Sequence, residues 1–163
     1  MEILRSVLRE LPEFQQLLAA LDGGQSPVAV SGLAAVHRAH FAACLGQESG
    51  RPVVMVCADE GEAERMARDL SFLTGGEVPV LAARSFLFHN IATVSRQWEH
   101  RRLRLLYRLT RGEIPCLVAT VEALLQRTLP PEALERACAV LEVGQTADLE
   151  ELTAHLTVSY THL

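Results

Sequence analysis

A candidate phosphate-binding loop occupies residues 27–37, which read PVAVSGLAAVH. The apolar run predicts a short strand, the Ser31-Gly32 pair predicts a tight turn, and a helix is expected to follow and to continue to about Gly46. In a nucleotide-binding α/β domain the phosphates bind at this point, because the first turn of the helix offers unpaired N–H groups and the positive end of its dipole.

The side chains that nucleotide hydrolysis requires are missing from this loop. A loop of the form G-x-x-x-x-G-K-[ST] places its lysine on the β- and γ-phosphates and its hydroxyl on Mg²⁺. With Gly32 aligned two residues before the lysine-proximal glycine, these positions fall on Ala35 and Val36. All fifteen basic residues are arginine, so no neighbouring register supplies a lysine. We therefore predict a degenerate loop at Gly32, Ala35 and Val36 that binds no cofactor, and no catalytic residue in the chain.

An acidic pair, Asp59-Glu60, follows the apolar run at 53–58 and could bind Mg²⁺ as the acidic pair of a helicase does. However, it follows the second predicted strand, and Glu62 lies three residues after Asp59. This D-x-x-E spacing is a variant of the capping box that begins a helix. We favour the capping interpretation.

His37, His40 and Cys44 lie at i, i+3 and i+7 of one predicted helix, close to one face, which formally permits a metal site. No other cluster of His or Cys completes it, so we predict no metal site. The four cysteines have no C-x-x-C spacing and three of them lie in apolar runs, which indicates reduced thiols in a core.

The predicted helix from about Ser95 to Arg111 carries the most informative surface. At about 100° per residue, four arginines fall in one stripe: Arg101, Arg104, Arg108 and Arg111. Four apolar residues fall on the other side: Trp98, Leu105, Leu106 and Leu109. The stripe is either a solvated face or a contact for an acidic partner or a phosphate backbone.

Composition restricts the function classes. The 163 residues carry a net charge of −5, which argues against a protein that coats nucleic acid, since such proteins are basic. No basic n-region followed by an apolar segment begins the sequence, and no apolar run approaches the length of about eighteen residues that spans a membrane. We expect a cytoplasmic protein with no membrane partner.

Strands and helices alternate along residues 1–128, which predicts an α/β fold with a mostly parallel sheet flanked by helices. After the strand and helix of the candidate loop, and including the N-terminal helix, the sequence predicts these elements in chain order: helix 3–22 broken at Pro12, strand 51–58, helix 59–73, strand 78–82, loop 84–94, helix 95–111, strand 114–119 and a helix capped by Thr120. After Pro130-Pro131 we expect a short helix, a strand at 137–143 and a helix at 148–156.

An ordered set of motifs resembles the N-terminal, UvrB-like region of the bacterial transcription-repair coupling factors (Mfd), over residues 1 to about 157. The motifs are SGLAA at 31–35, VVMVCAD at 53–59, SFLFHN at 85–90, SRQWEHRRL at 95–103 and VATVEALLQR at 118–127. The resemblance implies a degenerate helicase-like subdomain at 1–128 and part of a UvrA-recruiting subdomain at 129–157.

The resemblance also implies a function: a non-catalytic interaction module that helps to recruit UvrA to stalled RNA polymerase for nucleotide excision repair. ATP, Mg²⁺, DNA and RNA polymerase would be bound by other domains of the parent protein, an ATP-dependent DNA translocase. The alternative is a fragment of a nucleic-acid-binding helicase or UvrB-type protein that uses the Arg-rich helix. UvrB clamps DNA with an aromatic-rich hairpin, but residues 84–94 carry only Phe86 and Phe88, so clamping is not expected.

The last residues depart from the family pattern, which would continue with a Gly-Tyr-x-Arg-like sequence after Leu156. The chain reads VSYTHL at 158–163 instead. We therefore expect a truncated second subdomain followed by a non-native tail at 158–163.

Overall fold

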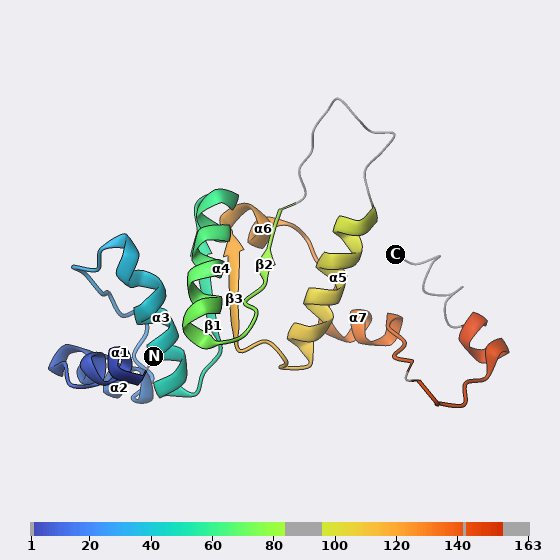
Figure 1. Ribbon diagram of the computed structural model, residues 1–163. Helices are drawn as coiled ribbons and strands as arrows, with labels where there is room; N and C mark the ends of the chain where they lie inside the picture. Colours follow the sequence, from blue (N-terminus) through green and yellow to red (C-terminus); the bar gives the residue numbers. More distant parts are fainter. Residues whose placement is uncertain (1, 84–95, 142, 155–163) are drawn as a thin grey trace, which may run out of the picture. The chain divides into compact units, whose positions relative to one another are not determined.

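The computed structural model describes residues 2–83, 96–141 and 143–154 (Figure 1). The chain divides into two compact units. The first, called the sheet unit below, comprises residues 1–94 and 114–126. The second, called the helical unit, comprises residues 95–113 and 127–163.

The described part of the sheet unit contains three strands, β1 (Val53–Cys57), β2 (Val80–Leu81) and β3 (Cys116–Thr120). Their order is β1-β3-β2, and both pairs are parallel. All five residues of β3 are buried, as expected for a parallel strand between two neighbours. The predicted α/β class with a parallel sheet is confirmed, and β2 is shorter than the expected strand at 78–82.

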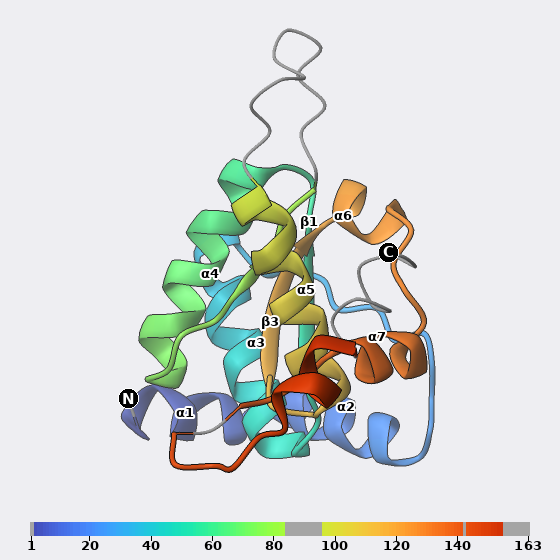
Figure 2. The ribbon, with the colours of Figure 1, turned by 90° about the vertical axis from the view of Figure 1, so that its right-hand side faces the viewer.

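Two helices, α3 (Ala35–Ser49) and α4 (Glu60–Thr74), contribute buried residues to the core of this unit together with the strands. Figure 2 shows both helices beside the strands, and they contact each other and β1. The buried cluster contains residues of α3, α4 and the strands together with Val78: Ala39, Ala42, Ala43, Cys57, Ala63, Met66, Ala67, Leu70, Val78, Cys116 and Val118. The buried residues of α3 are alanines and a cysteine, so this helix contributes only small side chains to its contact with α4.

Helix α3 continues past Gly46, where the sequence predicted its end, to Gly50. A Cβ atom at Gly46 would lie 2.6 Å from Cγ2 of Val53, so glycine is required there for space and not as a helix stop. Gly50 instead ends the helix with a positive φ of 64°.

The N-terminal helices are α1 (Glu2–Arg9) and α2 (Pro12–Asp22). The predicted break at Pro12 is confirmed, with Pro12 at the first position of α2, where a missing N–H costs nothing. The ring of Phe14 packs edge-to-face on Phe41 of α3, with ring centroids 5.6 Å apart.

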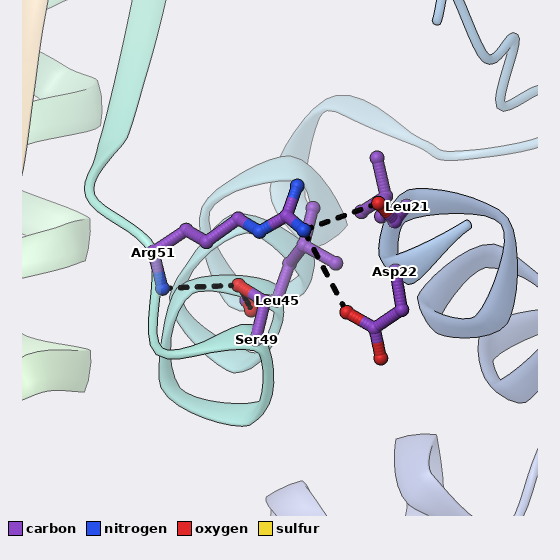
Figure 3. Close-up of polar contacts among 5 residues, drawn as sticks. All are labelled: Leu21, Asp22, Leu45, Ser49 and Arg51. Carbon is purple, nitrogen blue, oxygen red and sulfur yellow. Dashed lines mark hydrogen bonds and ion pairs between the residues drawn. The ribbon is translucent and has the colours of Figure 1, made fainter. Parts of the chain in front are cut away.

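A single arginine connects the end of α2 to the start of β1 (Figure 3). Arg51 donates a hydrogen bond from Nη2 to the carbonyl oxygen of Leu21 at 3.1 Å and lies 3.7 Å from Oδ1 of Asp22. A cation at a helix C-terminus satisfies an orphan carbonyl and interacts favourably with the helix dipole.

The helical unit contains α5 (Arg96–Thr110) and α7 (Pro131–Ala137), which contact each other. Each helix contributes one buried leucine, Leu105 and Leu134. Residues 149–154 form a further helical segment. The predicted loop at 84–94 and the predicted tail at 158–163 lie outside the described residues.

Two predicted strands are wrong. Residues 27–31 form no strand: the run begins with Pro27, which lacks an N–H for a ladder, and no described strand pairs with it. The described part of 137–143 also forms no strand, because α7 continues to Ala137 and the side chains of Val140, Leu141 and Val143 are exposed. An apolar run is typical of a strand, but a strand forms only where a second strand pairs with it.

One helix start follows a β-strand directly. Helix α6 (Val121–Leu125) begins at the end of β3, and Thr120 Oγ1 accepts a hydrogen bond from Ala123 N at 3.1 Å. The predicted N-cap at Thr120 is thus confirmed.

None of the helices in the described part of the chain is long and apolar enough to span a bilayer.

The first prediction concerns the core. Leu70 on α4 is fully buried, whereas Phe72, two residues later, is 79% exposed. We expect Leu70→Ala to lower the free energy of unfolding by about 2–5 kcal/mol, because it removes buried methyl groups and leaves a cavity. Urea denaturation followed by circular dichroism measures this. Phe72→Ala is the control and should change the free energy of unfolding by less than about 0.5 kcal/mol. Equal losses of this free energy in the two variants would contradict the packing described.

The second prediction concerns Arg51. We expect Arg51→Met, which keeps the aliphatic stem, to lower the free energy of unfolding by about 0.5 kcal/mol, a modest value because the side chain is half exposed. High salt should reduce the difference in the free energy of unfolding between Arg51→Met and the original chain. The control is Arg68→Met, which removes only an exposed ion pair to Glu64 at 4.0 Å and should be near neutral. A loss at Arg68 as large as that at Arg51 would refute a specific role for the helix end.

Candidate functional site

The candidate phosphate loop lies in residues 25–34, which have no regular secondary structure. Gly32 has a φ of 82°, in the left-handed region that favours glycine, and α3 begins at Ala35. Ala35 and Val36 are exposed, Val36 to 74%. At the positions where a phosphate loop has lysine and serine or threonine, the chain therefore offers neither a charge nor a hydroxyl.

Asp59 and Glu62 form the predicted capping box at the start of α4. Asp59 Oδ1 accepts a hydrogen bond from Glu62 N at 2.8 Å, and Glu62 Oε2 accepts one from Ala58 N at 3.1 Å. Arg38 of α3 lies 3.8 Å from the other carboxylate oxygen of Glu62. The acidic residues thus satisfy backbone donors at a helix start, which confirms the capping interpretation.

The third prediction separates a cap from a metal ligand. Because asparagine caps a helix about as well as aspartate, Asp59→Asn should leave the free energy of unfolding within about 0.5 kcal/mol of the original chain. Asp59→Ala should lower it by about 1 kcal/mol, since the N–H of Glu62 loses its acceptor. Thermal unfolding with and without Mg²⁺ measures both. A stabilisation by Mg²⁺ that Asp59→Asn abolishes would instead identify a cation site.

The group of His37, His40 and Cys44 on α3 forms no metal-binding cluster within the described residues. His37 is exposed, His40 is half-buried and Cys44 is buried. Nε2 of His40 is a buried nitrogen that has no hydrogen-bond partner among the described residues. Within the described residues, no three His, Cys, Asp or Glu side chains are grouped so that they could hold a metal ion.

The four cysteines form no disulfide, and three of the thiols have pKa values above the ordinary value. Burial is the main cause in each case. For Cys57 the nearby carboxylates of Glu62 and Asp59 raise the pKa further. These thiols are therefore neutral near pH 7, which fits core residues and not activated nucleophiles.

The arginine stripe (Arg101, Arg104, Arg108 and Arg111) lies on α5 and the residue after it, and all four side chains are exposed. Two of them meet one carboxylate. Nε of Arg108 lies 3.5 Å from Oε2 of Glu113, and Nε of Arg111 lies 3.9 Å from Oε1. No carboxylate among the described residues pairs with Arg101 or Arg104.

The end of α5 explains why Glu113 returns to the helix. Gly112 has a φ of 68°, and its N–H donates to Leu109 O at 3.0 Å. The N–H of Glu113 donates to Arg108 O at 3.1 Å. These two bonds define a Schellman motif, which reverses the chain and places Glu113 back beside Arg108.

A fifth arginine near the stripe has a different role. The guanidinium of Arg102 lies 5.7 Å from the centroid of the Trp98 ring, within the range of a cation–π contact. Burial lowers the pKa of Arg102 from the usual arginine value. Arg102 is half-buried, whereas the stripe is exposed, so it belongs to the packing of the helix.

Charge is distributed unevenly between α5 and the rest of the chain. Residues 96–113 hold six of the fifteen arginines and two of the twenty acidic residues, a net charge of +4. The remaining residues carry −9. The stripe is thus a local basic surface on an otherwise acidic chain.

Helical periodicity predicted that the four arginines lie in one stripe, but two features of this surface were not predicted. One is the ion pairing of Glu113, for which Gly112 was the available signal, because glycine just after a helix favours chain reversal. The other is the contact between Arg102 and Trp98, which their i, i+4 spacing could have indicated.

The sheet unit has an α/β fold with a parallel sheet, and the helical unit carries a basic helix. No family model matches the chain, and no solved structure matches it significantly. The transcription-repair-coupling factor of Bacillus subtilis (strain 168) is 27% identical over 158 residues, 96% of this chain and 13% of that protein. The transcription-repair-coupling factor of Myxococcus xanthus is 32% identical over 151 residues, 88% of this chain and 12% of that protein.

The chain is therefore related, over nearly its whole length, to the transcription-repair-coupling factors. This confirms the resemblance that the sequence motifs indicated. The chain spans about an eighth of the length of these two relatives.

Proposed function

We propose that the chain is a non-catalytic interaction module of a transcription-repair coupling factor, and that it helps to recruit UvrA for nucleotide excision repair in the cytoplasm. The arginine stripe is the proposed contact surface. The observation that carries this proposal is the exposure of all four arginines on one helix of a chain related to these factors.

The chemistry of the loop at 25–34 supports the non-catalytic part of the proposal. Transfer of a phosphoryl group depends on positioning and on charge stabilisation by a lysine and a metal ion. Ala35 and Val36 supply neither, and the acidic residue Asp59 is engaged in a cap. In the longer protein, ATP, Mg²⁺, DNA and RNA polymerase would be handled by other domains, so this module would supply binding alone.

The second candidate function is nucleic-acid binding through α5. The local charge of +4 favours it, because arginines bind phosphate well. The charge of −9 on the remaining residues opposes it, because a long polyanion would also approach the acidic part of the chain. Recruitment of a protein through a short acidic surface avoids that repulsion, so we place it first.

The fourth prediction tests recruitment. Calorimetry of the whole chain with UvrA should show binding, and a variant with glutamine at all four stripe positions should bind at least about tenfold more weakly, since interface charges contribute both steering and contacts. Circular dichroism should show that the variant remains folded.

The matched control is the pair Arg65→Gln and Arg68→Gln, which removes two exposed arginines at i, i+3 spacing from α4. It should leave the affinity for UvrA unchanged. Absence of UvrA binding by the original chain would refute recruitment, and equal weakening by the control would refute the stripe as the contact. Tight binding to DNA that falls steeply with salt would favour the second candidate.

A further inference from the structure

The arginine stripe consists of two pairs with the same spacing. Arg101 and Arg104 are three residues apart, as are Arg108 and Arg111, and each pair spans about 4.5 Å along the helix axis. The second pair already holds a carboxylate, Glu113, whereas no described carboxylate pairs with the first.

The carboxylate of Glu113 bridges its pair in a defined way. Its two oxygens face different guanidinium groups, Oε2 toward Arg108 and Oε1 toward Arg111. The two oxygens of one carboxylate lie close enough together to meet two such donors at once. The chain thus contains an example of one carboxylate that meets two arginines three residues apart, at the C-terminal end of α5.

From this example we infer that the Arg101–Arg104 pair is a binding site for one carboxylate side chain of an acidic protein surface, and that Glu113 is an internal competitor at the neighbouring Arg108–Arg111 pair. The inference adds a binding mode to the proposed contact surface, and it rests on the proposed function only in taking the partner to be a protein. The partner's Asp or Glu would sit across Arg101 and Arg104 as Glu113 sits across Arg108 and Arg111.

The charge pattern favours a carboxylate of a protein over a nucleic acid. Four guanidinium groups along about 15 Å of helix could follow a phosphate backbone only if all four were available. Two of them face Glu113, which leaves a short site that matches one or two carboxylates.

The charge of Glu113 is expected to limit the number of carboxylates that the stripe binds. Removing this charge frees Arg108 and Arg111, so a partner with several carboxylates gains a second contact. Each exposed ion pair contributes little on its own, and the expected gain is therefore about two- to fivefold in affinity. The Schellman motif at Gly112 depends on backbone bonds and is retained in Glu113→Gln.

The test measures fluorescence anisotropy of a labelled oligoglutamate peptide with the whole chain at low salt. We expect Arg101→Gln with Arg104→Gln to weaken binding about three- to tenfold, and Glu113→Gln to strengthen it about two- to fivefold. The matched pair Arg65→Gln with Arg68→Gln on α4 should have no effect. Equal weakening by both pairs, or no gain in Glu113→Gln, would overturn the inference.

Two further arms identify the source of the anion and separate this inference from the proposed function. A labelled oligothymidylate of similar charge should bind more weakly than oligoglutamate; tighter binding of oligothymidylate would overturn the carboxylate site in favour of a phosphate site. UvrA is titrated with the same variants. If oligoglutamate follows the expected pattern and UvrA does not bind, the carboxylate site stands and recruitment of UvrA fails.

Discussion

Strand β3 is the constraint on which the sheet unit depends. Both β1 and β2 pair with it, and every one of its residues is buried. Val118 lies in the cluster formed with α3 and α4, and Thr120 at the end of the strand caps α6. A change at the centre of β3 would therefore disturb two strand pairings and the helix packing together, which is why the strand consists of small and apolar residues.

The candidate contact surface depends on local structure within one helix. The spacing of the arginines, the positive φ of Gly112 and the two backbone bonds of the Schellman motif place Glu113 beside Arg108 and Arg111. All these groups belong to one continuous segment of the helical unit. The chemistry of the stripe is consequently a property of residues 101–113 alone.

Local signals predicted much of this structure. The apolar runs at 53–58 and 114–119 became β1 and β3, because each run finds a parallel neighbour. The Asp59–Glu62 box and the Thr120 cap were also predicted, because a cap depends on residues within four positions. The stripe followed from helical periodicity, and its role as a contact surface stays a prediction.

The incorrect sequence predictions share a physical cause. The run at 27–31 is as apolar as a strand, but pairing is a property of two segments and a single run does not reveal its partner. The same holds for the exposed residues Val140 and Leu141. The pairing of Glu113 was missed because it depends on the direction in which the chain leaves a helix. The end of α3 was placed at Gly46 because the sequence does not show that β1, the next element, folds back so that Val53 lies against this glycine.

Amide hydrogen exchange of the whole chain with and without UvrA tests the central claim most directly, because it reports where a partner covers the chain as well as whether it binds. We expect slower exchange on binding in residues 101–111, which carry the arginine stripe, with no change in residues 25–37. Protection confined to residues 25–37, or no protection anywhere at saturating UvrA, would contradict it.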